Sequence, residues 1–267
     1  MSGSAAAEPQ GDLYAGEVVV LGRIMPASNQ TCYGELTGTD APEPPRIVYK
    51  PTAGERPLWD FPDGTLAHRE YAAWLVSDAL GWDVVPPTVL RDGPLGPGMV
   101  QLWCEPDAGI EVVDLVAEGT VPPGFRHVLD ALDGADRPVS LIHEDSPGLR
   151  HMALFDVVVN NTDRKGGHVL AMSDGHRYGV DHGICFHVDD KLRTVLWGFA
   201  GEPLTDDELG AVTALVGDLD GQLGEQLSFH LTAQEISRTR RRARQLLQRG
   251  VLPGTGGGWP SIPWPPF

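Results

Sequence analysis

Two triplets that each begin with an aspartate are the groups in this sequence best suited to chemistry. They are Asp163-Arg164-Lys165 and, eighteen residues after its aspartate, Asp181-His182-Gly183. The first triplet closes an apolar helical pattern, and the second ends a short apolar stretch. Lys50 lies far upstream, at the end of a strand-like run. Phosphoryl transfer from a nucleotide needs one carboxylate for the attacking hydroxyl, one for a metal ion, and a cation on the phosphates.

The first triplet stands where a carboxylate is unfavourable unless it has a role. Asp163 follows Asn160-Asn161-Thr162 at a helix C-terminus, whose dipole is negative. We therefore predict that Asp163 accepts or orients the proton of an attacking hydroxyl. Arg164 and Lys165 are predicted to steady charge on the transferred group. The alternative is that this segment only caps the helix and turns the chain. Asp156, one helical turn before Asn160, is expected to hold the loop by hydrogen bonds.

The second triplet is a candidate metal site. Asp181 ends a strand and is followed by His182-Gly183, where glycine permits a sharp bend. A carboxylate in that position is a good Mg²⁺ ligand. His168 lies five residues after Asp163 and is either a second metal ligand or a structural histidine.

The nucleotide-binding candidates lie upstream. Lys50 is predicted to pair with Glu70 and so to hold its ammonium towards the phosphates. The loop 27–33, with Ser28 and Asn29, has a length suited to covering a triphosphate with free N–H groups, or is an ordinary hairpin turn. Only three lysines occur, Lys50, Lys165 and Lys191, against seventeen arginines. Two of them fall in the motifs above, which supports a phosphate-binding role.

The elements that must position these residues change in type along the chain. The first part is predicted to be rich in strands, and the second rich in helices. Strands are expected at 16–25, from 35, and at 46–50, 84–90 and 98–103, with a hairpin at 169–180. Helices are expected at 65–80, 110–118, 124–133, from Ser146-Pro147 to 159, and at 206–216 and 232–249. The predicted units are a disordered N-terminus (1–12), a β-rich N-lobe (13–105), a helical C-lobe (106–250) and a Gly/Pro/Trp-rich tail (251–267), extended and mobile or packed on the body.

These residues resemble the phosphatidylinositol 3-/4-kinase superfamily and, more loosely, the HipA-like kinases. That superfamily has a strand-end lysine, an Asp-Arg-His-x-x-Asn catalytic loop and an Asp-Phe-Gly metal motif. Here the lysine looks like Lys50, the loop looks like Asp163-Arg164-Lys165-Gly166-Gly167-His168, and the metal motif looks like Asp181-His182-Gly183-Ile184-Cys185-Phe186. The similarity covers roughly residues 16–200 and is nearest to an actinobacterial branch of small proteins of this type.

The resemblance implies a fold and a set of roles. It implies an α+β, two-lobed, protein-kinase-like fold, with Asp163 as catalytic aspartate and Asp181 as principal Mg²⁺ ligand. Residues 101–105 would be the hinge beneath adenine, with Gln101, Trp103 and Glu105 as cofactor-binding residues. Two positions depart from the pattern: Lys165 replaces a histidine, and His168 replaces a metal-binding asparagine. Because imidazole suits Mn²⁺ better than Mg²⁺, the metal preference is open.

Composition restricts the partners. The formal net charge of −17 argues against nucleic acid and anionic membrane surfaces. No run of eighteen apolar residues occurs, so integral membrane association is not expected. There is no signal-like N-terminus, and Cys32, Cys104 and Cys185 lack zinc-site spacing, so a reduced, cytoplasmic setting is expected.

Taken together, these features predict an ATP-dependent kinase that uses Mg²⁺ or Mn²⁺. Its expected partners are ATP and an acceptor hydroxyl on a protein or small molecule. Two alternatives use the same pocket. One is a catalytically weak or silent nucleotide-binding pseudokinase or scaffold module. The other is an enzyme that transfers AMP instead of phosphate.

Overall fold

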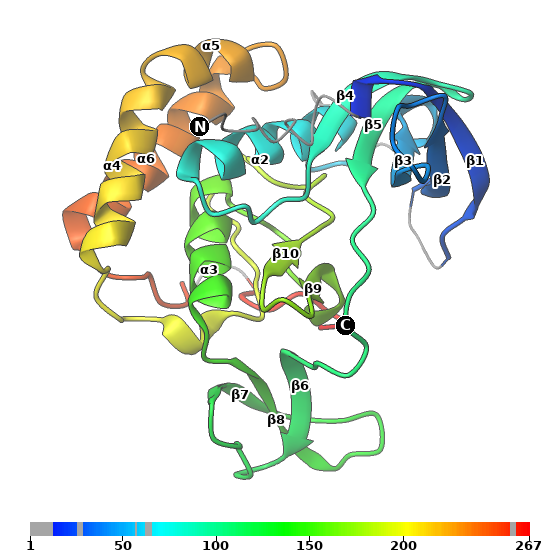
Figure 1. Cartoon of the computed structure of the whole chain (residues 1–267). Helices are drawn as coiled ribbons and strands as arrows, with labels where there is room; N and C mark the ends of the chain where they lie inside the picture. Colours follow the sequence, from blue (N-terminus) through cyan, green and yellow to red (C-terminus); the bar gives the residue numbers. More distant parts are fainter. Residues whose placement is uncertain (1–12, 26–28, 57, 62–65, 257–259) are drawn as a thin grey trace, which may run out of the picture.

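The chain has an α+β fold in which a β-rich N-terminal part precedes a mostly helical C-terminal part, as the sequence predicts (Figure 1). The structure, a computed structural model, describes residues 13–25, 29–56, 58–61, 66–256 and 260–267. The N-terminal part holds a five-stranded antiparallel sheet in the order β1-β2-β3-β5-β4. Its strands are β1 (Glu17–Arg23), β2 (Cys32–Thr37), β3 (Arg46–Pro51), β4 (Thr88–Gly93) and β5 (Gly96–Leu102).

Alternation along β3 decides where its lysine points. Ile47 and Tyr49 are fully buried in a small apolar cluster with Leu36, Val89 and Val100. Successive side chains of a strand point to opposite faces, so Lys50 leaves the sheet on the face opposite Tyr49. The short turn η1 (Thr52–Gly54) then leads towards α2 (Leu66–Leu80), which carries Glu70.

The described residues of the C-terminal part form the helices α3 (Pro147–Val159), α4 (Asp206–Leu219), α5 (Gln222–Leu227) and α6 (Ala233–Arg249). These helices enclose an apolar core that is larger than the cluster in the N-terminal sheet. The N-cap serine predicted at Ser146 accepts from Leu149 N at 3.4 Å, with Pro147 in the first turn. Thr232 and Glu235 form a reciprocal capping box that starts α6. The apolar face of α2 packs into this larger core as well, so α2 joins the two parts of the molecule.

The helices expected at 110–118 and 124–133 are wrong. These segments form β6 (Val113–Ala117) and β7 (Phe125–Leu132), on either side of β8 (Pro138–Glu144) in a three-stranded antiparallel sheet. Gly119 and Gly124 have positive φ values of 76° and 83°, and they lie in the turn region between β6 and β7. Backbone pairing with β8 therefore outweighs the local helical pattern. Figure 1 shows this sheet projecting from the body.

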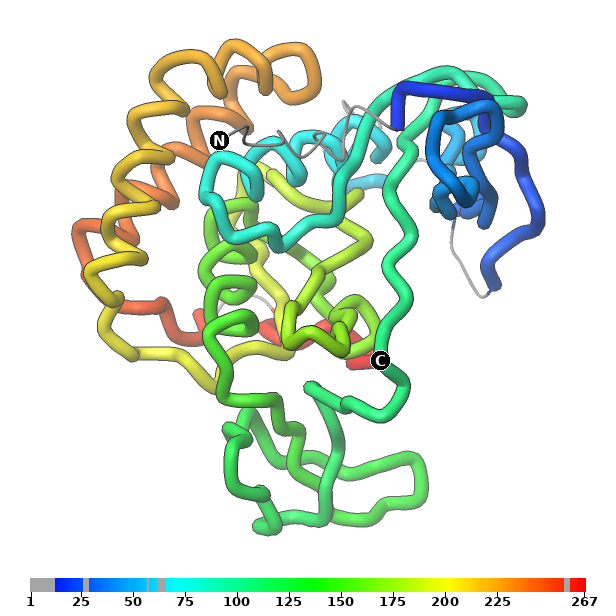
Figure 2. Tube along the Cα trace, in the orientation of Figure 1, coloured from blue at the N-terminus to red at the C-terminus, as the bar shows by residue number. Residues whose placement is uncertain are grey.

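Short elements carry the loops of interest. The predicted hairpin is present as β9 (Val169–Ala171) and β10 (Arg177–Gly179), and it follows the turn η2 (Gly166–His168). A further turn, η3 (Trp197–Phe199), precedes α4. The connector after β5 runs from the N-terminal sheet down to β6, and it passes the end of the chain (Figure 2).

The described residues of the tail lie against the body, which is one of the alternatives that the sequence left open. Ser261 O accepts from Thr194 N at 3.1 Å and from Trp197 Nε1 at 2.8 Å. Pro266 O accepts from Gly166 N at 2.8 Å. The tail therefore covers the backbone of the 163–168 loop.

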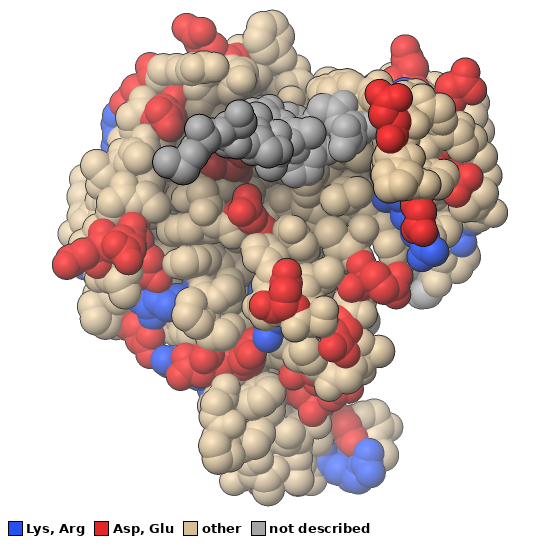
Figure 3. Space-filling view, in the orientation of Figure 1, with Lys and Arg blue, Asp and Glu red and all other residues tan. Residues whose placement is uncertain are grey.

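The surface reflects the charge balance of the sequence. In Figure 3, Asp and Glu side chains are spread over the visible face and outnumber Lys and Arg. Among the helices that the structure describes, none combines the length and apolar character needed to cross a membrane. The disorder expected for 1–12 concerns residues outside the described part of the chain.

Candidate active site

Lys50 joins the two parts of the molecule through two carboxylates. Its Nζ lies 2.5 Å from Glu70 Oε1 on α2 and 2.8 Å from Asp181 Oδ1. Burial lowers the pKa of Lys50, but the charges of Asp181 and Glu70 outweigh burial and raise it above its ordinary value. Lys50 in turn holds the pKa of Asp181 well below its usual range, against the opposing effect of burial. The sequence-predicted trio of Lys50, Glu70 and Asp181 is thus a charged cluster of one cation and two carboxylates.

Asp181 is held in an unusual backbone conformation. Its φ is +64°, in the left-handed region that non-glycine residues rarely adopt. Its side chain is about half exposed, whereas that of Glu70 is buried. The next residue is fixed from α2, because His182 N donates to Glu70 Oε2 at 2.8 Å. Glu70 therefore holds Lys50 with one oxygen and the 181–186 loop with the other.

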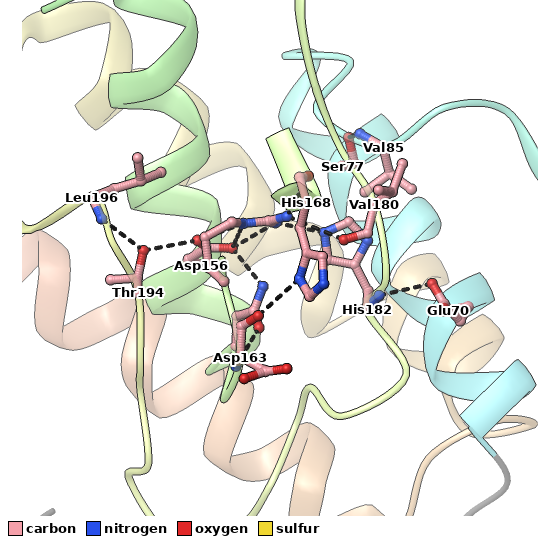
Figure 4. Close-up of polar contacts among 12 residues, drawn as sticks. Glu70, Ser77, Val85, Asp156, Asp163, His168, Val180, His182, Thr194 and Leu196 are labelled. Carbon is pink, nitrogen blue, oxygen red and sulfur yellow. Dashed lines mark hydrogen bonds and ion pairs between the residues drawn. The ribbon is translucent and has the colours of Figure 1, made fainter. Parts of the chain in front are cut away.

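A buried ion pair between Arg164 and Asp156 holds the 163–168 loop, and Figure 4 shows Asp156 of this pair near Asp163. Arg164 and Asp156 are both fully buried, and Arg164 Nη2 lies 2.9 Å from Asp156 Oδ1. Asp156 Oδ1 also accepts from Asn161 Nδ2 at 3.0 Å, so the expectation that Asp156 fixes this loop is confirmed. The guanidinium of Arg164 also donates to the carbonyl oxygens of His168 and Val180, each at 3.2 Å.

This placement corrects the expected role of Arg164. A guanidinium with no exposed surface, bonded to a carboxylate and two carbonyls, does not reach a transferred group. Its backbone is tied as well, because Arg164 N donates to Arg193 O at 3.0 Å and Arg164 O accepts from Val195 N at 3.1 Å. Arg164 is therefore a positioning residue. No signal in the sequence indicates this role, because Arg164 and Asp156 meet only in the folded chain.

No local pattern separates a buried arginine from an exposed one, because burial depends on which elements close over the side chain.

Asp163 keeps its carboxylate near two cations. Its Oδ2 lies 3.2 Å from Lys165 Nζ, and its Oδ1 lies 3.7 Å from Arg193 Nη2. Asp163 N donates to Asn161 Oδ1 at 3.0 Å, which fixes the start of the loop. Lys165 thus forms an ion pair with Asp163, and its predicted role on the transferred group stays a prediction. Arg193 is a neighbour that the motif did not identify.

His168 connects the two acidic loops (Figure 4). Its Nδ1 lies 2.9 Å from the carbonyl oxygen of Asp163, so Nδ1 carries the proton and donates. Its Nε2 then presents a lone pair 3.5 Å from Asp181 Oδ2. Burial lowers the pKa of His168, with Asp181 opposing, which favours this neutral form.

This pair of atoms fits one divalent ion. A neutral imidazole nitrogen fixed by a carbonyl at its other nitrogen is the usual state of a metal-ligating histidine. The nitrogen and oxygen donor set suits Mn²⁺ better than Mg²⁺. Within the described part of the chain, no group of three His, Cys, Asp or Glu side chains is arranged to hold a metal. An ion on His168 and Asp181 would therefore take its other ligands from water or phosphate oxygens, as nucleotide-bound ions commonly do.

The other described residues predicted to bind the nucleotide have hydrogen-bond partners of their own, apart from the cluster of Lys50, Glu70 and Asp181. Gln101 is buried and its Nε2 donates to Thr88 Oγ1 at 2.9 Å, so its side chain is occupied inside the sheet. Trp103 and Glu105 lie on the connector and bond to each other at 2.8 Å. Asn29 Oδ1 accepts from Arg56 N at 2.9 Å. Ser28 lies outside the described residues.

Asn160, at the end of α3, makes a set of side-chain hydrogen bonds that the sequence did not predict. Asn160 caps this helix with a left-handed φ of +52°. Its side-chain nitrogen donates to the carbonyls of His187 and Asp189, and its oxygen accepts from Lys191 N at 3.0 Å. The segment after the 181–186 loop is thereby tied to the helix that leads into Asp163.

Comparisons with known proteins place the chain among relatives. No protein-family model matches the sequence. A solved structure, that of the Helicobacter pylori proinflammatory kinase CtkA, is similar with a TM-score of 0.43 and 12% identity, over 89% of this chain and 93% of that one. A likeness of that size carries no argument about fold or chemistry. "Protein Rv2133c" of Mycobacterium tuberculosis is 52% identical over 262 residues, covering 94% of this chain and 93% of its own length. The chain therefore belongs to the same family as that mycobacterial protein.

Proposed function

We propose that the chain is an ATP-dependent kinase. The observation that carries this proposal is the contact of Lys50 with Glu70 at 2.5 Å and with Asp181 at 2.8 Å. It joins a strand of the N-terminal sheet to a carboxylate on the loop next to Asp163. A cation, a metal-binding carboxylate and a proton-accepting carboxylate are the parts that phosphoryl transfer needs.

Each residue has one role in the proposed reaction. Lys50, held by Glu70, binds phosphate oxygens of ATP. Asp181 and His168 would hold Mg²⁺ or Mn²⁺, and the ion would neutralise charge on the phosphates. Asp163 accepts the proton of the acceptor hydroxyl while the hydroxyl oxygen bonds to the γ-phosphorus. The bond from that phosphorus to the bridging oxygen breaks, and ADP leaves with the electron pair. The acceptor is a hydroxyl on a protein or small molecule.

The test is transfer from labelled ATP. Purified protein with Mn²⁺ or Mg²⁺ is expected to label itself or an added acceptor. Lys50→Met, Asp163→Asn and Asp181→Asn should each lower the rate at least about a hundredfold, as losses of acid–base and electrostatic groups do. Asp220→Asn is the matched control, since Asp220 pairs with Arg240 and Arg244 beyond α4. Wild-type rates in all three variants would refute the assignment.

A second candidate is nucleotide binding without transfer. It is favoured by the ion pair of Lys165 with Asp163, which occupies the carboxylate needed as proton acceptor. It predicts that ATP with Mn²⁺ raises the melting temperature while no labelled product forms. Mass spectrometry of the incubated protein also separates the two transfer reactions, because a phosphate adduct supports the kinase and an adenylate adduct supports AMP transfer.

A further inference from the structure

A cavity of about 400 Å³ lies directly beside the 163–168 loop. Gly166 and Gly167 of that loop form part of its wall, together with Val169 of β9. The opposite wall comes from the connector and the start of β6, residues 110–115, and Phe267 lines it as well. The cavity is therefore bordered by the loop that carries Asp163.

The lining of the cavity is apolar and acidic. Val112, Val113 and Val169 are buried and give it an apolar floor. Its two charged lining residues are Glu111, which is exposed, and Asp114, and both are acidic. A ligand that carries positive charge beside apolar groups is complementary to this lining.

The backbone beside the cavity can bind an extended chain. β6 is an edge strand, because the sheet order is β6-β8-β7. Glu144 N donates to Val112 O, and Glu118 N donates to Pro138 O. The backbone N–H and C=O groups of the even-numbered residues in this segment therefore point towards β8. The backbone groups of Val113 and Leu115 then face the other edge. Leu115 N donates to Asp114 Oδ1 at 2.7 Å. A backbone carbonyl of an added strand can take the place of that carboxylate as acceptor. Edge strands can accept peptides as an additional strand, and on this edge Leu115 is exposed and Val113 is buried.

We propose that this cavity and the β6 edge form the acceptor subsite, and that its ligand is an extended peptide segment with basic and apolar side chains around a serine or threonine. The transfer of phosphate to that hydroxyl rests on the proposed kinase function, whereas binding of the peptide does not. The net charge of −17 adds a long-range attraction for a basic segment.

Two variants change the lining of the cavity: Glu111→Lys lies outside the 163–168 loop, whereas Gly167→Leu lies within it and is read together with ATP binding. Glu111→Lys reverses one of the two charges of the cavity. Gly167→Leu fills the cavity, because a Cβ on Gly167 meets no atom within 4 Å and the φ of Gly167 is not in the left-handed region. Glu118→Lys is the matched control, since Glu118 is exposed just after β6 and does not line the cavity.

Binding and transfer are measured separately. Fluorescence anisotropy compares a labelled serine peptide flanked by arginine and leucine with the same peptide carrying glutamate in place of arginine. The basic peptide is expected to bind at least about tenfold more tightly, a difference of about 1.4 kcal/mol. Glu111→Lys and Gly167→Leu should weaken its binding at least about fivefold, and Glu118→Lys should not. The KM for transfer to the basic peptide should rise in parallel, without a change in ATP binding.

The outcomes distinguish this proposal from the proposed function. Preferential binding that Glu111→Lys abolishes, without any transfer from ATP, supports the subsite and counts against the kinase. Transfer from ATP with no preference for the basic peptide, or with no effect of either cavity variant, overturns the subsite and leaves the kinase standing. Transfer confined to a small-molecule hydroxyl also overturns the peptide proposal.

Discussion

Arg164 donates from Nη2 to Nε2 of His182 across 2.7 Å, inside the protein, where both side chains are fully buried. This contact joins the loop that carries Asp163 to the loop that carries Asp181. Burial, with the charge of Arg164 adding to it, lowers the pKa of His182 far below its ordinary value, so the ring is neutral and accepts the hydrogen bond. The two acidic loops are therefore held at a fixed separation by residues that face neither solvent nor the cavity.

The first prediction concerns the buried ion pair between Arg164 and Asp156. Asp156→Ala leaves the buried guanidinium of Arg164 without its carboxylate, and such a loss costs about 3–5 kcal/mol of unfolding free energy. Urea unfolding measures this loss, and the coupling of the pair comes from the single variants Asp156→Leu and Arg164→Met and the Asp156→Leu/Arg164→Met double variant. The double variant should lose less than the sum of the two single variants, because it leaves no unpaired charge. Strict additivity would show that the pair is not coupled.

The second prediction uses two adjacent glycines. A Cβ on Gly166 would lie 2.5 Å from Phe267 Cε1 and 3.2 Å from Val113 Cγ1, whereas one on Gly167 meets nothing within 4 Å. Gly166→Ala should therefore displace the ring of Phe267, at a cost below the range of about 1–3 kcal/mol usual for a well-packed core, because that ring is half exposed. Gly167→Ala is the control. Urea unfolding and carboxypeptidase release of the C-terminal residues provide the measurements. Equal behaviour of the two variants would show that the tail does not pack on this loop.

The third prediction concerns metal preference and rests on the proposed site of His168 and Asp181. His168→Asn replaces a nitrogen ligand with an amide oxygen, which suits Mg²⁺ better than Mn²⁺. The ratio of apparent affinities for Mn²⁺ and Mg²⁺ should fall at least about tenfold, a size seen even for residues that only support a ligand. Metal-dependent thermal shift with ATP measures that ratio. An unchanged ratio would show that His168 is structural.

The fourth prediction is a pH dependence of stability away from the candidate site. His230 Nδ1 lies 3.0 Å from His68 Nδ1, and burial, with the charge of His68 adding to it, lowers the pKa of His230 to about 4. In the unfolded chain His230 binds a proton below about pH 6.5, whereas in the folded chain it binds one only as the pH approaches about 4. The resulting stability is present above pH 6.5 and is lost as the pH falls towards 4.

His230→Gln removes that contribution. The decrease in melting temperature between pH 7 and pH 5 should be smaller in the variant than in the wild type. Histidines such as His143 and His151, whose pKa values burial also lowers, keep part of the slope in both proteins. An identical slope in the two proteins would show that the pair does not titrate as described.

Local signals in the sequence determined the elements that flank the candidate site. Ser146-Pro147 predicts the start of α3, and Thr232 with Glu235 starts α6, because a capping side chain acts on backbone groups within three residues. The chain order of Lys50, Asp163 and Asp181 was enough to suggest which side chains converge, and the structure brings Lys50 and Asp181 into contact.

Tertiary structure alone decided the rest. Residues 113–117 and 125–132 form strands where the local pattern indicated helices, because pairing with β8 satisfies their backbone groups. Arg164 became a buried support and Arg193 a neighbour of Asp163 because of the chain segments that pack around them. Sequence spacing describes contacts within one element, whereas burial and ion pairing between distant segments depend on how the elements pack. The candidate chemistry could therefore be read from residue types, and its supporting contacts only from the fold.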